Sequence, residues 1–474
     1  MIKSNNSFRR ISPLILSMLI IFLLSFVTPK PAQAFTVGEE KEAGEKLLVL
    51  VRQQLKFLNE PDITQYINGL AHSILTTAGP QYFNYHFYVI DNKVFNAFAA
   101  PSGLIFFHSG LIETMDTEGE LVGVMAHEIG HVTSRHIAES IEKSQKINLG
   151  SLALVLAGIA MGGGDISQAV ITGSIAAGAS MELYFSRQHE EEADRLAFKW
   201  MKESNRNTHD LVTMLQKMRR ISQFRQGDIP PYLLTHPDTE KRLSYVQDLV
   251  AMSRDMTSPP QDNFAFLRIK SRILSLTRNP TALLPRYLNN LSQAKTQGDP
   301  LQEAFAHYGL AQVHLSNADF NKARESLLKV IALFPDKAIL QADLGNIYFQ
   351  EGNYDKALEI LTKARQADRN CAYTAFYLAR AYEQKGELKT ALALYNELLP
   401  ILPEYSRLHY HLGQVKAAMG EKGQGHYSLG LYFWHEGNQK NAVFHLQEAL
   451  KNLPEDDGTR KKAELLLETI KKSS

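Results

Sequence analysis

The chain has 474 residues, too many for a single hydrophobic core, so two or more domains are expected. Its 51 lysines and arginines almost equal its 50 aspartates and glutamates, so it has no basic field to attract nucleic acid, and we expect no nucleic-acid partner. Cys371 is the only cysteine, which excludes an intramolecular disulfide. Such a chain must rely on packing, or on a bound ion, rather than on disulfides.

The N-terminus has the pattern of a secretory signal peptide. Three basic residues precede an apolar run over residues 11–27, and an A-x-A cleavage site ends at Ala34. We therefore predict that residues 1–34 are removed after Ala34 and that the chain works in a bacterial periplasm. The alternative is that the apolar run is retained as an inner-membrane anchor. No cysteine lies near Ala34, which excludes a lipoprotein anchor.

The following residues predict helices and a small sheet. An amphipathic helix is expected over residues 37–58, and Asp62 is placed to cap a second helix that ends near Thr77. Residues 85–90 alternate and are rich in aromatic side chains, which predicts a strand. Residues 103–107 predict a second strand, paired with the first.

Between these strands, residues 92–97 predict a turn. A strand just before a metal-binding helix is often the edge to which an extended substrate adds by main-chain hydrogen bonds. The second strand is either such an edge or a strand that only covers the core. The residues support both interpretations equally.

The motif H-E-I-G-H lies in a stretch with the pattern of a helix. Thr117 can cap the helix, and apolar residues recur with a 3.6-residue period. Four residues of α-helix turn by about 400°, so His127 and His131 share a face and can both bind one Zn²⁺. Glu128 can take a proton from a water molecule that the metal makes acidic. The motif predicts one Zn²⁺ per chain and Glu128 as general base.

Glycines and a small-residue region surround this motif. Gly123 and Gly130 each cost about 1 kcal/mol relative to Ala, which indicates that another element packs closely against the helix. Residues 149–161 and 169–179 are apolar and rich in small residues, and each piece is too short to span a bilayer at about 20 residues. We expect a buried helical hairpin there. The alternative is peripheral contact with a membrane or with an apolar substrate.

A run of acidic residues offers the third metal ligand. Two histidines and an open water position leave room for one more protein ligand, but chemistry alone does not choose among Glu190, Glu191 and Glu192. Glu190 and Asp194 share a helix face, so one can bind metal while the other hydrogen-bonds a ligand histidine. Glu191 and Glu192 are expected to be solvated, and His189 is turned about 100° away from the shared face.

A further histidine lies in the segment T-H-P-D. His236 precedes Pro237, so its backbone is expected to be extended rather than helical. Held on such a loop, His236 could approach the open metal position, where it would either stabilise the transition-state oxyanion or block the metal at rest. A solvated loop histidine is the remaining alternative.

In this order, H-E-I-G-H, E-E-E-A-D and T-H-P resemble the motifs of the zinc endopeptidases related to the prenyl-protein (CAAX) proteases, and the soluble exported branch is the better match. The resemblance implies zinc binding by His127, His131 and Glu190, general-base catalysis by Glu128, orientation of a ligand by Asp194, and regulation over the metal by His236. Residues 96–101 also resemble the segment before the family's substrate-edge strand, although Ser102-Gly103 stands where the family has paired glycines.

The second half of the chain has a 34-residue period. Residues 253–262 have the composition of a linker, and two helices are expected after it, over 264–276 and 282–295. The period then appears in equivalent leucines and in the small residues of tight helix crossings: Leu310, Leu344, Leu378, Ala323, Ala357 and Ala391. These features are typical of tetratricopeptide repeats, which we place near 304–337, 338–371 and 372–405.

The period breaks over residues 406–456. Residues 406–419 are expected to form an unpaired helix, followed by a final repeat whose register is shifted by half a unit. Residues 465–471 would cap the stack. The extra helix would bend the solenoid toward the first domain.

Together these features predict an α-rich, α+β protein. Residues 35–252 form a zincin-type metallopeptidase domain of helices and a small sheet, and residues 263–474 form an all-α solenoid of tetratricopeptide repeats. We expect an exported zinc endopeptidase that cleaves unfolded or misassembled envelope proteins. The resemblance suggests outer-membrane proteins as substrates and the outer-membrane β-barrel assembly machinery as the partner of the repeats. The alternatives are a chaperone or assembly adaptor with latent peptidase activity, or an anchored inner-membrane peptidase.

Overall fold

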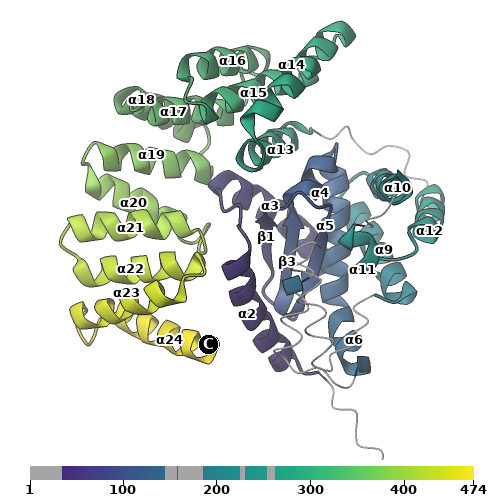
Figure 1. Cartoon of the computed structure of the whole chain (residues 1–474), viewed down its shortest axis with the longest axis horizontal. Helices are drawn as coiled ribbons and strands as arrows, with labels where there is room; N and C mark the ends of the chain where they lie inside the picture. The colour runs from purple at the N-terminus through teal and green to yellow at the C-terminus, as the bar shows by residue number, and fades with distance from the viewer. Residues whose placement is uncertain (1–34, 145–156, 159–184, 225–229, 254–261, 474) are drawn as a thin grey trace, which may run out of the picture.

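The computed structural model describes residues 35–144, 157–158, 185–224, 230–253 and 262–473. The chain folds into an N-terminal part that contains a small sheet and a C-terminal arc of helices (Figure 1). The predicted signal peptide, and nearly all of the predicted apolar hairpin, lie outside the described residues. None of the described helices is long and apolar enough to cross a membrane.

The N-terminal part combines helices with three short strands. In chain order its elements are α2 (Val37–Gln54), α3 (Pro61–Ala78), β1 (His86–Ile90), β2 (Ala97–Ala100), the 3-10 helix η1 (Pro101–Gly103), β3 (Leu104–His108), α4 (Ser109–Thr114), α5 (Glu118–Thr133), α6 (His136–Ser144), α9 (Arg187–Glu203), α10 (His209–Phe224), α11 (Pro231–Thr235) and α12 (Thr239–Met252). One hydrophobic core joins the strands to α2, α3, α5 and α10. The predicted α-rich, α+β class is confirmed.

The sheet has the order β1-β3-β2. The predicted pairing of the strands at residues 85–90 and 103–107 is confirmed. These strands, β1 and β3, run parallel, with Phe87 opposite Ile105. The strand just before the predicted metal-binding helix, β3, is therefore central, and its interpretation as an edge was wrong. The edge nearest to α5 is β2, whose sequence A-F-A-A gave no strand signal because alanine has low β propensity.

Helices α5 and α9 cross closely, which brings their side chains together. A Cβ on Gly130 would lie 3.1 Å from Cα of Ala193 in α9, and one on Gly123 would lie 3.0 Å from Cδ2 of Leu211 in α10. The close packing predicted from these two glycines is confirmed. Thr117 caps α5 as predicted, because its hydroxyl accepts a hydrogen bond from the backbone N–H of Glu120 at 3.2 Å.

Asp62 does not cap α3, contrary to the prediction. The helix begins at Pro61 without a side-chain cap, and Asp62 is buried inside its first turn. There Oδ2 of Asp62 accepts hydrogen bonds from Arg268 at 2.9 Å and from Arg272 at 3.1 Å. Both arginines belong to the C-terminal part, so this carboxylate joins the two halves of the chain.

The C-terminal part is built entirely from helices in its described residues. In order they are α13 (Phe264–Thr277), α14 (Pro280–Gln297), α15 (Pro300–Ser316), α16 (Phe320–Leu333), α17 (Ala338–Glu351), α18 (Tyr354–Ala367), α19 (Ala372–Gln384), α20 (Leu388–Leu398), α21 (Ser406–Ala418), α22 (Lys422–His435), α23 (Gln439–Asn452) and α24 (Gly458–Ser473). The pairs α15–α16, α17–α18 and α19–α20 correspond to the three repeats expected from the 34-residue period.

The irregular region differs from the prediction in one respect. Helix α21 is not unpaired, because it packs tightly against α22. A Cβ on Gly413 would lie 2.7 Å from Cγ of Leu429, and Gly425 approaches the backbone of α21 in turn. Helix α22 also packs against α23, so it serves as the second helix of one pair and the first of the next. This double use produces the half-unit shift of the sequence register.

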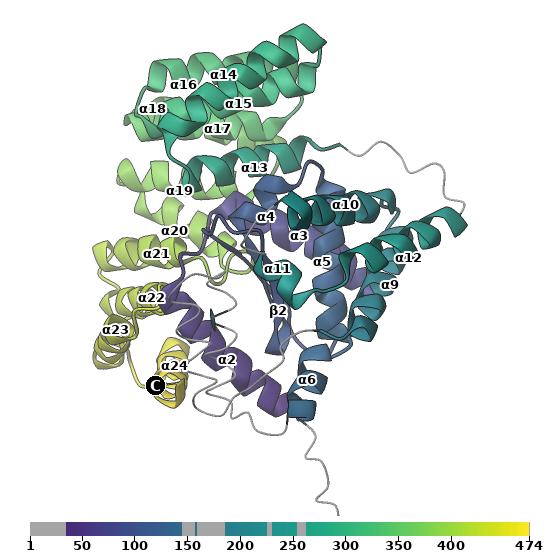
Figure 2. The ribbon, with the colours of Figure 1, turned by 45° about the vertical axis from the view of Figure 1, so that its right-hand side comes forward.

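The repeats curve around one side of the N-terminal part, beside α2, α3 and β1 (Figures 1 and 2). Glu404, after α20, accepts hydrogen bonds from Arg52 and from the hydroxyl of Tyr88, both at 2.7 Å, and lies 3.1 Å from Nδ1 of His86. Gln65 of α3 accepts a hydrogen bond from a backbone N–H at the start of α19. Since β1 and β2 are opposite edges of the sheet, the repeats contact the edge that lies away from β2.

Candidate metal centre

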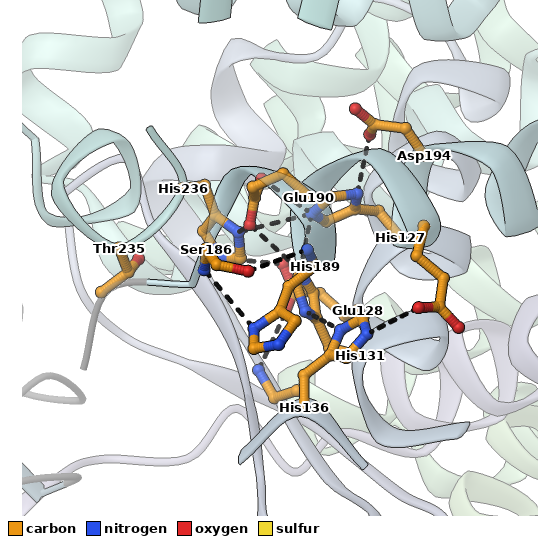
Figure 3. A network of polar contacts seen from close by, with 12 residues as sticks. His127, Glu128, His131, His136, Ser186, His189, Glu190, Asp194, Thr235 and His236 are labelled. Atoms are coloured by element: carbon orange, nitrogen blue, oxygen red, sulfur yellow. Dashed lines mark hydrogen bonds and ion pairs between the residues drawn. The ribbon is translucent and has the colours of Figure 1, made fainter. Parts of the chain in front are cut away.

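Four buried side chains from three separate segments meet beneath α11. His127 and His131 come from α5, Glu190 comes from α9, and His236 follows α11 (Figure 3). One possible ligand atom from each lies within 4.8 Å of all the others. The structure therefore brings together the three predicted metal ligands and the predicted loop histidine.

The ligand atoms of the two α5 histidines face one point. Their Nε2 atoms are 3.0 Å apart, as expected for imidazoles one helical turn apart on one face. The carboxylate of Glu190 approaches from α9, with Oε1 lying 3.3 Å from Nε2 of His131 and Oε2 lying 3.5 Å from Nε2 of His127. Two imidazole nitrogens and one carboxylate are a donor set that suits a tetrahedral divalent ion with one open position.

His236 adds a fourth possible ligand atom to the cluster. Its Nδ1 is 2.9 Å from Oε1 of Glu190 and 3.3 Å from Nε2 of His127. Tyr232 stacks on the imidazole with a centroid distance of 4.3 Å, and the backbone N–H of His236 donates to the carbonyl of Tyr232. The ring is thereby held against the cluster rather than in solvent.

Glu128 lies beside the cluster. One of its carboxylate oxygens is hydrogen-bonded, and the other has no hydrogen-bond partner in the described part of the chain. Its Oε2 accepts a hydrogen bond from the backbone N–H of Ala99 in β2 at 2.9 Å. Its Oε1 is buried and has no hydrogen-bond partner within the described part of the chain, and the same holds for Nε2 of His236, 3.6 Å away. Two buried polar atoms that face each other in this way suit a water molecule or a polarised substrate group between them.

Asp194 orients the first histidine from the far side. Its Oδ1 lies 2.8 Å from Nδ1 of His127, and the carboxylate also accepts two hydrogen bonds from Arg242 at 2.8 Å and one from the hydroxyl of Tyr245. An acceptor at Nδ1 fixes the proton there and leaves the Nε2 lone pair directed at the cluster. Arg242 also approaches Nδ1 of His127, but that atom cannot accept from Arg242 while it donates to Asp194.

Arg242 keeps both Glu190 and Asp194 ionised. Burial alone would raise the pKa of Asp194, but the guanidinium of Arg242 beside it holds that pKa well below its usual range. The pKa of Glu190 is also held low against burial, by Arg242 and by His236. Nη1 of Arg242 lies 2.6 Å from Oε2 of Glu190. Charged carboxylates are the form in which acids bind metal and accept hydrogen bonds.

The other members of the acidic run point away from the cluster. Glu191 forms an exposed ion pair with Arg195 one turn later. Glu192 accepts a hydrogen bond from the hydroxyl of Ser134 at 2.8 Å. His189 stacks on His136 with a centroid distance of 4.3 Å, and its Nε2 lies 3.2 Å from Glu139 rather than near the cluster.

Sequence reasoning missed the side chains that support the site. Arg242, Tyr245 and Tyr232 were not recognised, because each lies in a helix whose local pattern is ordinary. The one available signal was Arg242, a basic residue shortly after T-H-P-D. Two ionised acids at Glu190 and Asp194 need such a counter-charge. Phe185, which stacks on His131 at 3.8 Å, carried no signal at all.

A helix with H-E-x-x-H, a second helix that supplies a carboxylate and an edge strand beside the general-base candidate together define a metalloendopeptidase, a hydrolase of peptide bonds. Residues 58–250 match the model of peptidase family M48, and residues 308–370 and 348–415 match tetratricopeptide-repeat models. Residues 58–250 thus match an M48 peptidase domain, and tetratricopeptide repeats follow it.

Several named proteins resemble this chain, two of them over most of its length and one over a smaller part. The β-barrel assembly-enhancing protease of Escherichia coli K12 is 29% identical over 394 residues, covering 82% of this chain and 79% of that protein. The protein of the same name from Yersinia pestis is 27% identical over 411 residues, covering 85% and 82%. The metalloprotease LoiP of Escherichia coli K12 is 29% identical over 188 residues, covering 39% of this chain and 68% of that protein.

Proposed function

We propose that this chain is a zinc-dependent endopeptidase of the bacterial periplasm that acts on misassembled outer-membrane β-barrel proteins. The observation that carries the proposal is the convergence of ligand atoms from His127, His131 and Glu190 on one buried point. Two nitrogens and a carboxylate oxygen are the ligand set of many catalytic zinc sites. The names of the relatives, and the signal-peptide pattern of residues 1–34, support the compartment and the substrate class.

The proposed mechanism assigns proton transfer to Glu128. When bound, zinc would make a water molecule acidic enough to ionise near neutral pH. Glu128 would take the proton of this water through its free Oε1 and later deliver it to the leaving amine. Its Oε2 stays fixed by the N–H of Ala99, so the carboxylate cannot rotate away.

The edge strand β2 would hold the substrate. Backbone pairing of Asn96 with His108 leaves the backbone groups of Ala97 and Ala99 directed away from β3, but the N–H of Ala99 is already bound to Glu128. Both residues are buried, so a substrate could add to this edge only after the structure around them has opened. An extended substrate that adds to this edge would run past Glu128. The same segment is the one whose sequence resembles the substrate-edge loop of the family.

His236 is proposed to block the metal at rest. Its Nδ1 lies among the ligand atoms, where an incoming carbonyl would have to bind, so the T-H-P segment must move before substrate can enter. His236→Ala should then raise cleavage. A fall in cleavage would instead assign His236 to stabilisation of the transition state.

The proposal is tested by comparing the purified chain, residues 35–474, with its Glu128→Gln variant. Cleavage of an unfolded outer-membrane β-barrel protein should fall by about 10²–10⁴-fold, with zinc content unchanged. Equal cleavage by both proteins would refute the assignment of Glu128.

The alternative of a chaperone or assembly adaptor makes a different prediction in cells. If the Glu128→Gln variant fully restores envelope protein assembly to cells that lack the gene, docking by the repeats is the main function. If envelope proteins accumulate in the cells that carry the Glu128→Gln variant, proteolysis is required. The same cells reveal the substrates, since proteomics identifies which proteins accumulate.

A further inference from the structure

The two α5 histidines have unlike partners on the side away from the ligand cluster. His127 faces the buried carboxylate of Asp194 at 2.8 Å. The corresponding Nδ1 of His131 faces another imidazole, with Nδ1 of His136 at 2.9 Å (Figure 3). The usual outer partner of a metal-binding histidine is a carboxylate, a carbonyl or water, so a histidine in this place needs an explanation.

The hydrogen-bond partners of His131 and His136 determine which nitrogen of each ring carries a proton. A metal bound at Nε2 of His131 requires the proton of that ring to be on Nδ1. That proton points at Nδ1 of His136, which must therefore be an acceptor. In neutral imidazole the remaining proton is then on Nε2 of His136. Nε2 of His136 lies 3.4 Å from Oε2 of Glu192, an acceptor placed to receive it.

The rings of the pair are held by packing as well as by hydrogen bonds. His136 is fully buried, and the ring of His189 lies nearly parallel to it at 4.3 Å, with an interplanar angle of 12°. Phe185 stacks on His131 at 3.8 Å with an interplanar angle of 22°. Neither imidazole can rotate away without losing a stacked neighbour, so the contact between the two Nδ1 atoms is a constrained feature of the fold.

We propose that His136 is a positioning residue that holds His131 in the tautomer required for metal binding and passes the hydrogen-bond chain on to Glu192. The inference rests on the proposed zinc function and extends it to two residues outside the ligand set. Glu192 is pinned by the hydroxyl of Ser134 at 2.8 Å, so the chain ends on an acceptor that is itself oriented. His127 is thus oriented by a buried carboxylate, whereas His131 is oriented by a neutral chain of hydrogen bonds that leads to the surface.

The test measures the zinc affinity of the full mature chain by competition with a chelator. His136→Leu removes the acceptor and keeps a buried apolar side chain, and zinc affinity should fall about 10–100-fold. His136→Gln supplies an amide oxygen to accept from His131 and an NH₂ group to donate to Glu192, so it should retain most of the affinity. Glu191→Gln changes an exposed acid of the same helix that pairs with Arg195, and should leave the affinity unchanged.

Two further measurements separate positioning from a general loss of structure. In the metal-free state, the Leu and Gln variants of His136 should both unfold in a single cooperative transition, which shows that each is folded. In the wild-type zinc protein, ¹⁵N-histidine spectra should show His136 protonated on Nε2 and unprotonated on Nδ1, a readout that needs no variant.

The outcomes are distinguishable from failure of the proposed function. Wild-type zinc binding with no loss in His136→Leu would overturn this inference alone, as would an equal loss in the Gln and Leu variants. A proton found on Nδ1 of His136 would overturn it even if the Leu variant fails to fold. A wild-type chain that binds no zinc would remove the proposed function and this inference together.

Discussion

The peptidase domain and the repeats fix their helices by different means. Around the metal centre, α5, α9 and α12 are joined by buried charges, in which Arg242 pairs with both Glu190 and Asp194. In the repeats, helix crossings such as that of Gly309 with the ring of Tyr287 depend on small residues, and the buried pair of Arg268 with Asp343, between α13 and α17, is a charged exception. Buried ion pairs specify angle and atom position, whereas small residues specify only how closely two helices approach.

This difference predicts which property each substitution affects. Changes among the buried charges should alter metal affinity and stability together, because the same side chains orient the ligands. Changes at the helix crossings of the repeats should alter stability and leave metal affinity unaffected. The substitutions below test that separation.

The largest effect is expected from Asp194→Ala in the metal-free protein. The change leaves Arg242 buried with only one of its two carboxylates, and the free energy of unfolding should fall by about 3–5 kcal/mol, measured by urea denaturation. Adding Arg242→Met should recover part of the loss, since an apolar side chain needs no partner. If Asp194→Ala alone lowers the free energy of unfolding by less than about 1 kcal/mol, these charges do not hold the helices in place.

In the repeats, Gly309→Ala should lower stability without lowering zinc affinity. A Cβ at this position would lie 2.1 Å from Cε1 of Tyr287, which is buried, so the ring or the helix must shift at a cost of about 1–3 kcal/mol. The matched control is Gly69→Ala in α3, where a Cβ would meet nothing within 4 Å. Urea denaturation measures the stability, and chelator competition measures the zinc affinity. A loss of zinc affinity in Gly309→Ala would contradict the expected separation of the two properties.

Glu404→Gln tests the junction between the two regions. Burial would raise the pKa of Glu404, but His86 and Arg52 hold it well below its usual range. A carboxylate with a depressed folded pKa stabilises the fold above about pH 4.5, and this contribution is lost as the pH falls through the folded pKa. We expect the variant to lose about 1.5 kcal/mol at pH 7.

The difference between the wild type and Glu404→Gln should then shrink as the pH falls from about 4.5 toward the folded pKa, because the carboxylate of the unfolded chain is protonated first and that of the folded chain only at lower pH. Urea denaturation at pH 7 and at lower pH measures it. A difference that is the same at every pH would show that the charge of Glu404 contributes nothing to the junction.

The smallest change in stability is expected from Gly130→Ala, at the crossing of α5 and α9. A Cβ there would lie 3.1 Å from Cα of Ala193, so α9 must move by a few tenths of an ångström. Because α9 carries Glu190, zinc affinity should fall several-fold while the midpoint of unfolding changes little. Chelator competition measures the affinity, with Gly69→Ala again as control. An unchanged affinity would mean that the site tolerates this displacement.

Sequence patterns predicted the parts of the molecule that depend on local spacing. H-E-I-G-H on a helix, two acids one turn apart at Glu190 and Asp194, and the 34-residue period all follow from neighbours along one helix or one repeat. The cluster of His127, His131, Glu190 and His236 is what the structure then assembles from these segments.

The parts that could not be predicted depend on partners distant in sequence. Asp62 looked like a helix cap because caps are local, yet its partners, Arg268 and Arg272, lie more than 200 residues later. The role of Arg242 could not be assigned from its position in the sequence, because that role exists only once α9 and α12 are packed together. The strand β2 was missed because its burial beside α5, rather than its alanine-rich sequence, makes it a strand.

The central claim is that one zinc ion is held by two histidines of α5 and a carboxylate of α9. The most direct measurement is anomalous diffraction at the zinc edge from crystals of the mature chain. The account predicts a single peak per chain within roughly 2.0–2.2 Å of Nε2 of His127, Nε2 of His131 and a carboxylate oxygen of Glu190. A map without a peak there, or a zinc that Glu190 does not reach, would contradict it.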